Sequence, residues 1–332
     1  MRLSEQISNS PGEKDANMGQ LTIVIPLYNE KEVFPLLVER LNSTIQHLEC
    51  SVEVLFIEDG STDGTRQLVE LKVKDDKRYS AIFLSRNHGH QLALTAGLKA
   101  VKMGSDVFVL DGDLQDPPEL INAFRSKMNE GFDVVYGVRK KRKASFFKKI
   151  AYWVYYRMIR GISSINLPVD SGDFCLMRYR VVAQLNRMTE NDRYIRGMRT
   201  WIGFRQTGLE YERPDRAAGT TKYSWSLLFK LAYSGLFNFS RKPIQLVAKA
   251  GAVVIAISVF YASNVIYQKI FHDQNPEGFT AVVTLIVMST GINLLALGVV
   301  GEYVYRTFEL AKNRPLYVVE KFIRNGLEEL PE

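Results

Sequence analysis

Short runs of aliphatic and β-branched residues alternate with segments of helical periodicity along the first 140 residues of this 332-residue chain. We expect strands at residues 21–27, 52–57, 80–84, 106–110 and 133–138, with helices at residues 30–47, 65–73, 90–102 and 117–129. This alternation predicts a mostly parallel α/β sheet, because each helical crossover returns the chain to the same end of the sheet. Ligands of such sheets bind at the carboxyl ends of the strands. The residues that directly follow each predicted strand are therefore the candidates for a binding site.

Two aspartates, Asp111 and Asp113, directly follow the fourth predicted strand. Residues two apart in an extended chain point the same way, so both carboxylates can converge on one ion. The small Gly112 between them lets another group approach the backbone. Oxygen ligands suit Mg²⁺ or Mn²⁺, and a diphosphate would supply the remaining ligands. An isolated Asp-Gly-Asp is also a common turn, but the position after a buried strand favours metal binding.

Acidic and small polar residues also follow the first two predicted strands, at residues 26–30 and 58–64. Because the carboxyl ends of parallel strands share one edge, these loops and Asp111 predict one rim that contacts a base, a ribose and a diphosphate. The chain has no Gly-x-Gly-x-x-Gly after the first strand and no Walker-type loop, which disfavours a dinucleotide dehydrogenase or an ATPase. The alternative for residues 59–63 is a simple turn with a helix N-cap, and both interpretations can hold together.

The net charge of +7 favours an anionic partner, which is a nucleic acid, a phosphate compound or an anionic membrane surface. Cys50 and Cys175 are the only cysteines of the chain. Two cysteines so far apart argue against a disulfide framework or a zinc site, and they are typical of a reducing compartment.

Two long apolar runs, at residues 244–270 and 279–303, are each long enough for a helix to cross a hydrocarbon core of about 30 Å. The polar stretch between them is short, so the two helices would form a hairpin with both outer ends on one side of the membrane. Basic residues flank the outer ends, whereas the turn has acidic residues and no lysine or arginine. The positive-inside rule then places the α/β domain and both termini in the cytoplasm, at a bacterial plasma membrane. The alternative is a buried core hairpin of a soluble protein.

The remaining segments give the expected organisation of the chain. Apolar residues recur near a helical period after residue 223, which predicts an amphipathic segment in the membrane interface, and residues 146–162 are a second candidate. A helix packed on the sheet is the alternative for both. We expect a disordered tail over residues 1–20, an α/β domain over 21–222, an interfacial segment over 223–243, membrane helices over 244–270 and 279–303, and a cytoplasmic tail over 304–332.

Seven strings of the chain together resemble family 2 glycosyltransferases of the GT-A fold, from about residue 21 to the C-terminus. The strings are VIPLYNE, EDGSTDGT, LSRNHGHQLALTAGL, LDGDLQDPPE, DSGDFCLM, RGMRTWIGF and RAAGTTKYS. Within that family the chain is most similar to polyprenyl-phosphate glycosyltransferases, such as bactoprenol glucosyltransferases and dolichyl-phosphate mannose synthases. The resemblance implies inverting transfer of a hexose from a nucleotide-sugar, with UDP-glucose favoured, to a polyprenyl phosphate. GDP-mannose and a modified pentose donor stay open.

The resemblance also implies roles for individual residues. The nucleotide-sugar is expected to contact Pro26, Tyr28, Asn29, Glu30, Asp59, Gly60, Ser61 and Gly112. The Mg²⁺ or Mn²⁺ site corresponds to Asp111, Asp113 and Gln115. Phosphate groups of donor or acceptor are expected to contact Arg139, Arg216 and Lys222, since a diphosphate leaving group needs fixed positive charge.

Asp173 is expected to be catalytic, either as a base or as a residue that orients the acceptor or a basic side chain. A lipid phosphate is already anionic near neutral pH, so it does not require a strong base. For His88 and His90, polar loop contacts are favoured over metal ligation. The expected partners are membrane lipids and further copies of the chain, and no motif supports nucleic-acid binding.

Two other functions compete with this interpretation. A processive polysaccharide synthase would carry a Gln-x-x-Arg-Trp motif and more membrane spans, whereas this chain reads Arg199-Thr-Trp201 and has two predicted spans. A non-catalytic scaffold or flippase partner would not need both Asp111 and Asp113. Both alternatives are therefore disfavoured.

Overall fold

The computed structural model describes residues 20–140, 171–212 and 278–329, together with individual residues between 247 and 271. The predictions for the N-terminal tail, for residues 146–162 and 223–243, and for Arg216 and Lys222 lie outside these residues. Much of the predicted membrane helix at residues 244–270 also lies outside them.

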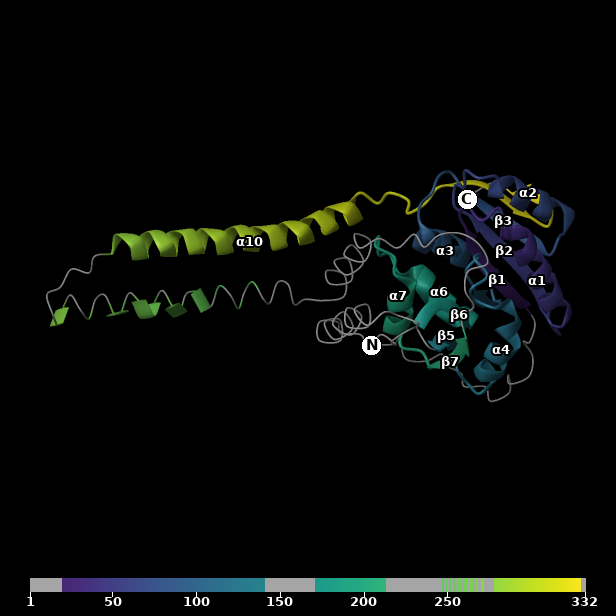
Figure 1. Ribbon diagram of the computed structural model, residues 1–332, viewed down its shortest axis with the longest axis horizontal. Helices are drawn as coiled ribbons and strands as arrows, with labels where there is room; N and C mark the ends of the chain where they lie inside the picture. Colours follow the sequence, from purple (N-terminus) through teal and green to yellow (C-terminus); the bar gives the residue numbers. More distant parts are fainter. Residues whose placement is uncertain are drawn as a thin grey trace, which may run out of the picture.

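Four parallel strands form the centre of the sheet, in the order β4 (Asp106–Val109), β1 (Gln20–Leu27), β2 (Ser51–Glu58) and β3 (Tyr79–Leu84). All three pairings within this group are parallel. The parallel direction agrees with the predicted crossovers and confirms a Rossmann-type α/β fold of the GT-A kind. Figure 1 shows the strands side by side, with helices on both faces.

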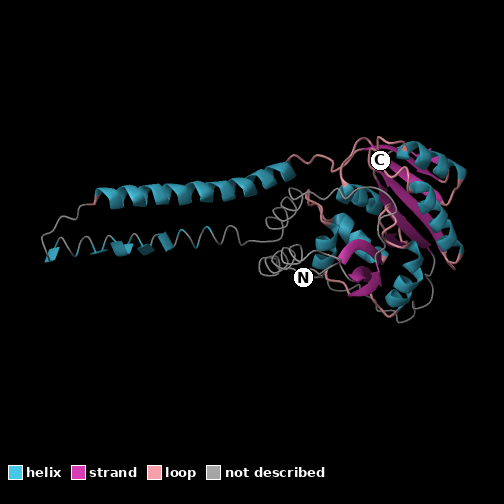
Figure 2. Ribbon diagram, in the orientation of Figure 1, coloured by secondary structure: helices cyan, strands magenta, loops and turns pink. Residues whose placement is uncertain are grey.

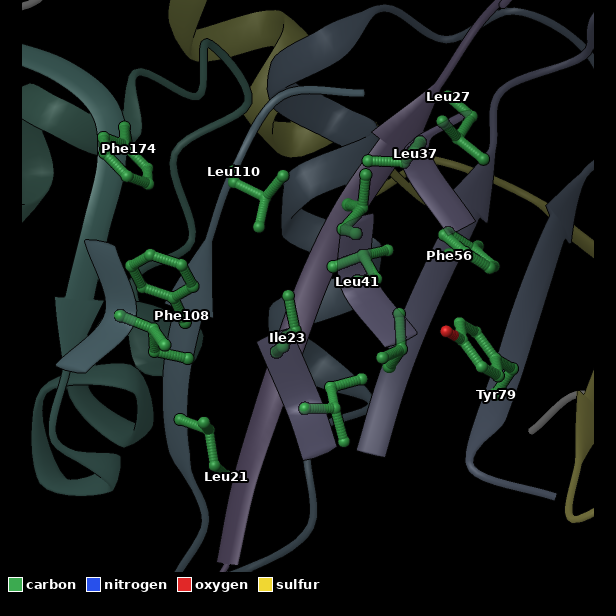
Figure 3. Packing of buried hydrophobic residues seen from close by; sticks show 14 of the residues in the cluster. Leu21, Ile23, Leu27, Leu37, Leu41, Phe56, Tyr79, Phe108, Leu110 and Phe174 are labelled. Atoms are coloured by element: carbon green, nitrogen blue, oxygen red, sulfur yellow. The ribbon is translucent and has the colours of Figure 1, made fainter. Parts of the chain in front are cut away.

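Helices cover the two faces of the sheet through two separate apolar clusters. The first cluster lies under α1 (Phe34–Gln46), α2 (Thr65–Asp75) and α4 (Ile121–Asn129). The short 3₁₀ helix η1 (Pro118–Leu120) directly precedes α4. The first cluster includes Ile23, Phe56, Phe108 and Phe174, which point to one side of the strands in Figure 3. The second cluster lies under α3 (His90–Lys99), α6 (Tyr179–Arg187) and α7 (Ile195–Ile202). Because successive strand residues face opposite sides, a strand that is buried on both faces, such as β1, supplies both clusters.

Antiparallel pairing extends the sheet beyond β4. There β6 (Ser171–Met177) pairs antiparallel with both β4 and β5 (Val134–Lys140), and β7 (Gln206–Glu212) pairs parallel with β5. The carboxyl end of β4, which carries the aspartate pair, therefore lies beside the amino end of β6, which carries Asp173.

The C-terminal residues differ from the predicted tail over 304–332. The helix α10 (Phe279–Ala311) continues eight residues past the predicted end at 303 and extends away from the sheet, as Figures 1 and 2 show. After it, β8 (Val319–Arg324) pairs antiparallel with β3, and β9 (Leu327–Glu329) pairs with β8. Strand β3 would otherwise leave a row of backbone groups unpaired at the sheet edge, and Ile323 and Phe322 of β8 pack on opposite apolar clusters. Among the described residues, no helix is both long enough and apolar enough to be assigned as a membrane span.

Candidate active site

The loops after β1 and β2 are held together by hydrogen bonds between their polar residues. Asn29, whose φ of 54° is left-handed, donates its N–H to Ser61 Oγ at 3.0 Å, and its Oδ1 accepts the N–H of Thr62 at 2.8 Å. The N–H of Glu30 is bound by Thr65 Oγ1 at 2.9 Å. These contacts bring the predicted nucleotide residues of the two loops together at one edge of the sheet, as the parallel topology requires.

The carboxylate of Asp59 is buried and accepts two backbone hydrogen bonds, from His88 at 2.7 Å and from Gly89 at 2.9 Å. Burial raises the pKa of Asp59, although these two donors oppose the rise. Asp59 therefore holds the loop between β3 and α3, which carries His88 and leads directly to His90, the first residue of α3. Tyr28 is about one-third exposed beside it, and Pro26 lies within β1. The residues that follow the first three strands form one connected rim.

Gly60 sits where this rim has no room for a side chain. Its φ is 69°, and a Cβ placed there would lie 2.5 Å from backbone atoms of Arg86 and of Asn87. We expect Gly60→Ala to lower the stability by about 1–3 kcal/mol and to weaken UDP binding, because it pushes the β3–α3 loop away from Asp59. Thermal unfolding and UDP titration measure both effects.

Gly104→Ala is the matched control for this prediction. Gly104 also has a left-handed φ, of 84°, but nothing lies within 4 Å of its added Cβ. The control therefore reports the cost of the backbone conformation without the clash. Equal losses of stability for Gly60→Ala and Gly104→Ala would contradict the close approach of the two loops.

The aspartate pair lies where the sequence predicts it, at the carboxyl end of β4. Gly112 packs so closely on β1 that a Cβ would lie 2.5 Å from Leu27 Cδ2 and 3.2 Å from the Pro26 carbonyl oxygen. Asp113 is buried, and its Oδ1 accepts the N–H of Gln115 at 3.2 Å. Leu114, which lies between these two residues, has a left-handed φ of 59°. The close turn thus fixes the direction of both carboxylates.

Among the described residues, no group of three or more His, Cys, Asp or Glu side chains is arranged to hold a metal ion. Mg²⁺ commonly takes only one or two protein carboxylates and completes its shell with water and substrate phosphates. The oxygen donors of Asp111 and Asp113 fit that kind of partial site.

Asp173 lies opposite the aspartate pair and is contacted by three side chains from other elements. His90 Nε2 lies 3.3 Å from Asp173 Oδ2 and 3.7 Å from Asp111 Oδ1, so the imidazole sits between the two carboxylates. Gln91 Nε2 donates to Asp173 Oδ2 at 2.9 Å, and Arg196 Nε lies 3.3 Å from Asp173 Oδ1. His90, Gln91 and Arg196 belong to the strings that resemble the family, but sequence reasoning gave none of them a role in the site.

The charges of this cluster stabilise one another. Burial alone would raise the pKa of Asp173, but the positive charges of Arg196 and His90 outweigh burial and hold that pKa well below its usual range. Burial would lower the pKa of His90, but the hydrogen bond to Asp173 and the charge of Asp111 raise it to about 9. Asp173 is therefore anionic at neutral pH and a weak base. This arrangement favours the orienting role for Asp173 over the role of a general base.

Arg139 lies at the end of β5, against the chain that leads to Asp173. A Cβ on Gly172 would lie 3.3 Å from Arg139 Nη2. Burial lowers the pKa of Arg139, but a hydrogen bond with Tyr211 and the charges of Asp116 and Asp111 raise it above its usual value. Tyr211 in turn donates to Asp116 Oδ1 at 2.6 Å. Arg139, one of the three predicted phosphate-binding residues, therefore lies on the side of the site that carries Asp111 and Asp116.

The chain is similar to known proteins in sequence and in structure. Residues 22–185 match the family described as glycosyl transferase family 2. The chain is 41% identical to the uncharacterized glycosyltransferase YkcC of Bacillus subtilis over 91% of this chain and 94% of that protein. It is 31% identical to the bactoprenol glucosyl transferase of Shigella phage SfII over 92% of this chain and 99% of that protein. A solved structure of mannosyltransferase PcManGT from Pyrobaculum calidifontis, in complex with GDP-Man and Mn2+, has a TM-score of 0.39 at 15% identity, covering 83% of this chain and 86% of that one.

The family match runs from β1 into α6 and includes the aspartate pair and Asp173. The relatives align with 91% and 92% of the chain. The chain therefore belongs to glycosyl transferase family 2, and it is a glycosyltransferase.

Proposed function

We propose that this enzyme transfers a hexose from a nucleotide-sugar, with UDP-glucose as the favoured donor, to a polyprenyl phosphate such as undecaprenyl phosphate. The acceptor is inferred from one observation: a protein named bactoprenol glucosyl transferase aligns with 92% of this chain. The site is compatible with a phosphate acceptor, because the basic groups of His90 and Arg196 both flank Asp173.

The proposed reaction is a single displacement. A phosphate oxygen of the lipid attacks C1 of the sugar, the bond from C1 to the diphosphate breaks, and the configuration at C1 inverts. The acceptor is anionic before it reacts, so the enzyme needs no strong base, which agrees with the low pKa of Asp173. Asp173 orients His90 and Arg196, and these cations receive the acceptor phosphate.

Charge on the leaving diphosphate must also be stabilised. We propose that Asp111, Asp113 and Gln115 hold a Mg²⁺ or Mn²⁺ ion, which would neutralise the diphosphate as it departs. Arg139 supplies fixed positive charge beside them. Arg216 and Lys222 remain proposed phosphate contacts on the strength of the resemblance.

We place the enzyme at the cytoplasmic face of a membrane, with residues 244–270 and 279–303 as a membrane hairpin. The lengths of the two apolar runs support this placement. So do Leu294, Leu295 and Leu297 of α10, which are all about two-thirds exposed although they point in different directions around the helix. Such a surface needs lipid, or further copies of the chain, around it. A lipid phosphate is held at the membrane surface, so an anchored enzyme meets its acceptor there.

The test is transfer by the purified full-length chain in lipid nanodiscs that contain undecaprenyl phosphate. UDP-glucose, GDP-mannose and a UDP-linked pentose are supplied separately with Mg²⁺ or Mn²⁺, and mass spectrometry detects the glycolipid. We expect polyprenyl-phosphate glucose from UDP-glucose. If GDP-mannose is the only donor that gives product, UDP-glucose is the wrong donor and the mannose-synthase alternative is favoured. No glycolipid with any donor, under conditions in which UDP binds, would support the non-catalytic scaffold.

A further inference from the structure

Gln91 connects Asp173 to the start of α7. Its Nε2 donates to Asp173 Oδ2 at 2.9 Å, and its Oε1 accepts the backbone N–H of Ile195 at 2.8 Å. Ile195 is the first residue of α7, so its N–H has no partner within that helix. Arg196, the next residue, reaches Asp173 Oδ1. The position of the Asp173 carboxylate therefore depends on where α7 begins.

The loop that leads into α7 is itself held by a buried arginine. Arg193 donates to the carbonyl oxygens of Met188 at 2.7 Å and Leu185 at 3.1 Å, at the end of α6, and its Nε lies 3.3 Å from Thr95 Oγ1 of α3. These bonds satisfy carbonyls that the end of α6 leaves open. The loop at residues 188–194 is thus tied to the same helix, α3, that carries His90 and Gln91.

The same loop contacts α10. Arg306 Nη1 lies 2.7 Å from Asp192 Oδ2, and Asn191 Nδ2 donates to the carbonyl oxygen of Glu309 at 3.1 Å. These partners are 114 and 118 residues apart in the chain. Figure 1 shows α7 at the end of the α/β domain from which α10 extends. The helix proposed as the membrane anchor therefore contacts the loop that sets the start of α7.

We propose that α10 positions Asp173 through this loop, with Arg306, Asp192 and Gln91 as positioning residues. The inference rests on the proposed function, because its purpose is to align the acceptor side of the site with a phosphate held at the membrane surface. The contacts of Asn191 and Asp192 given above are with α10. The contact between α10 and the loop therefore acts on the acceptor and leaves the donor unaffected.

The test uses the full-length chain in nanodiscs with the donor that gives product. We expect Gln91→Met to lower kcat/KM for undecaprenyl phosphate by about tenfold, since it removes both hydrogen bonds at similar volume. Asp192→Asn and Arg306→Gln are each expected to raise KM for the lipid by about two- to fivefold, the range open to a partly exposed ion pair. The Kd for UDP is expected to change less than about twofold in all three variants, because none of these residues contacts the nucleotide rim.

A double-mutant cycle distinguishes positioning from loose structural damage. The variant that combines Asp192→Asn with Arg306→Gln is expected to raise the lipid KM no further than Arg306→Gln alone, because Arg306→Gln already removes the pair with Asp192, together with a second pair between Arg306 and Glu302 at 2.9 Å. Combining Gln91→Met with Arg306→Gln is likewise expected to be less than additive, because both act through α7.

Glu320→Gln is the matched control. Glu320 of β8 pairs with Arg66 at 2.8 Å, and this pair has nearly the same exposure as the pair of Asp192 and Arg306. It also joins the C-terminal segment to the α/β domain, but it lies outside the α7 loop. We expect its lipid KM to be unchanged.

Three results would overturn the inference while the wild type still makes glycolipid. One is that Asp192→Asn and Arg306→Gln each have the same lipid KM as the control variant Glu320→Gln. Another is full additivity of Gln91→Met and Arg306→Gln. The third is a loss of UDP affinity equal to the loss in kcat/KM. Failure of the wild type to glycosylate the lipid from any donor would instead overturn the proposed function.

Discussion

Replacing Asp111 with asparagine is expected to lower kcat by about two to three orders of magnitude while the protein stays folded. Asparagine has the same shape, so the tight turn around Gly112 is preserved, but the negative charge that would hold a divalent cation is lost. The distance of 3.7 Å to His90 Nε2 also means that the imidazole loses one of its two carboxylates. EDTA is expected to inactivate the wild type to a similar extent, and added Mn²⁺ or Mg²⁺ is expected to restore it.

A second readout for this prediction does not depend on turnover. Mn²⁺ is expected to strengthen UDP binding to the wild type and to have little effect on UDP binding to Asp111→Asn, as measured by calorimetry. Glu119→Gln is the control, because Glu119 lies in η1, shortly after the aspartate pair, but pairs with Arg40 at 2.7 Å on the surface. Full activity of the wild type in EDTA would show that the two aspartates serve transfer without a metal.

Replacing Asp173 with asparagine is expected to lower kcat by about a hundredfold and to leave the Kd for UDP within about twofold. Asp173 is the shared anion of His90 and Arg196, and its loss leaves these two side chains without the carboxylate that both contact. Burial is then the dominant influence on His90, so its pKa is expected to fall. Steady-state kinetics with saturating lipid and a separate UDP titration measure the two effects.

Asp106→Asn is the control for this second prediction. Asp106 also lies on the central sheet and pairs with an arginine, Arg178, at 3.4 Å, but it sits at the opposite end of β4 from the aspartate pair. It reports the cost of losing a carboxylate from an ion pair in the same domain. If Asp173→Asn weakens UDP binding as much as it slows turnover, Asp173 belongs to the donor site or to the fold instead of the acceptor side.

The sequence by itself determined the centre of the fold and one edge of the site. The parallel direction of β1 to β4 follows from short apolar runs joined by helical segments, because local periodicity identifies strands and a crossover dictates their direction. The carboxyl ends of these strands then share one edge. For that reason the sequence alone predicts that Asp59 and the Asp111 pair lie on one edge of the sheet.

The tertiary structure decided what faces those residues. His90, Gln91, Asp173 and Arg196 come from α3, β6 and α7, and the partners of Gln91 lie 82 and 104 residues further along the chain. The sequence likewise did not predict that β8 pairs with β3, because residues 319–324 form a strand only when they pair with the open edge of the sheet. Periodicity and motif spacing are local, whereas ion pairs and edge pairing depend on which distant segments the packing of the two apolar clusters brings together.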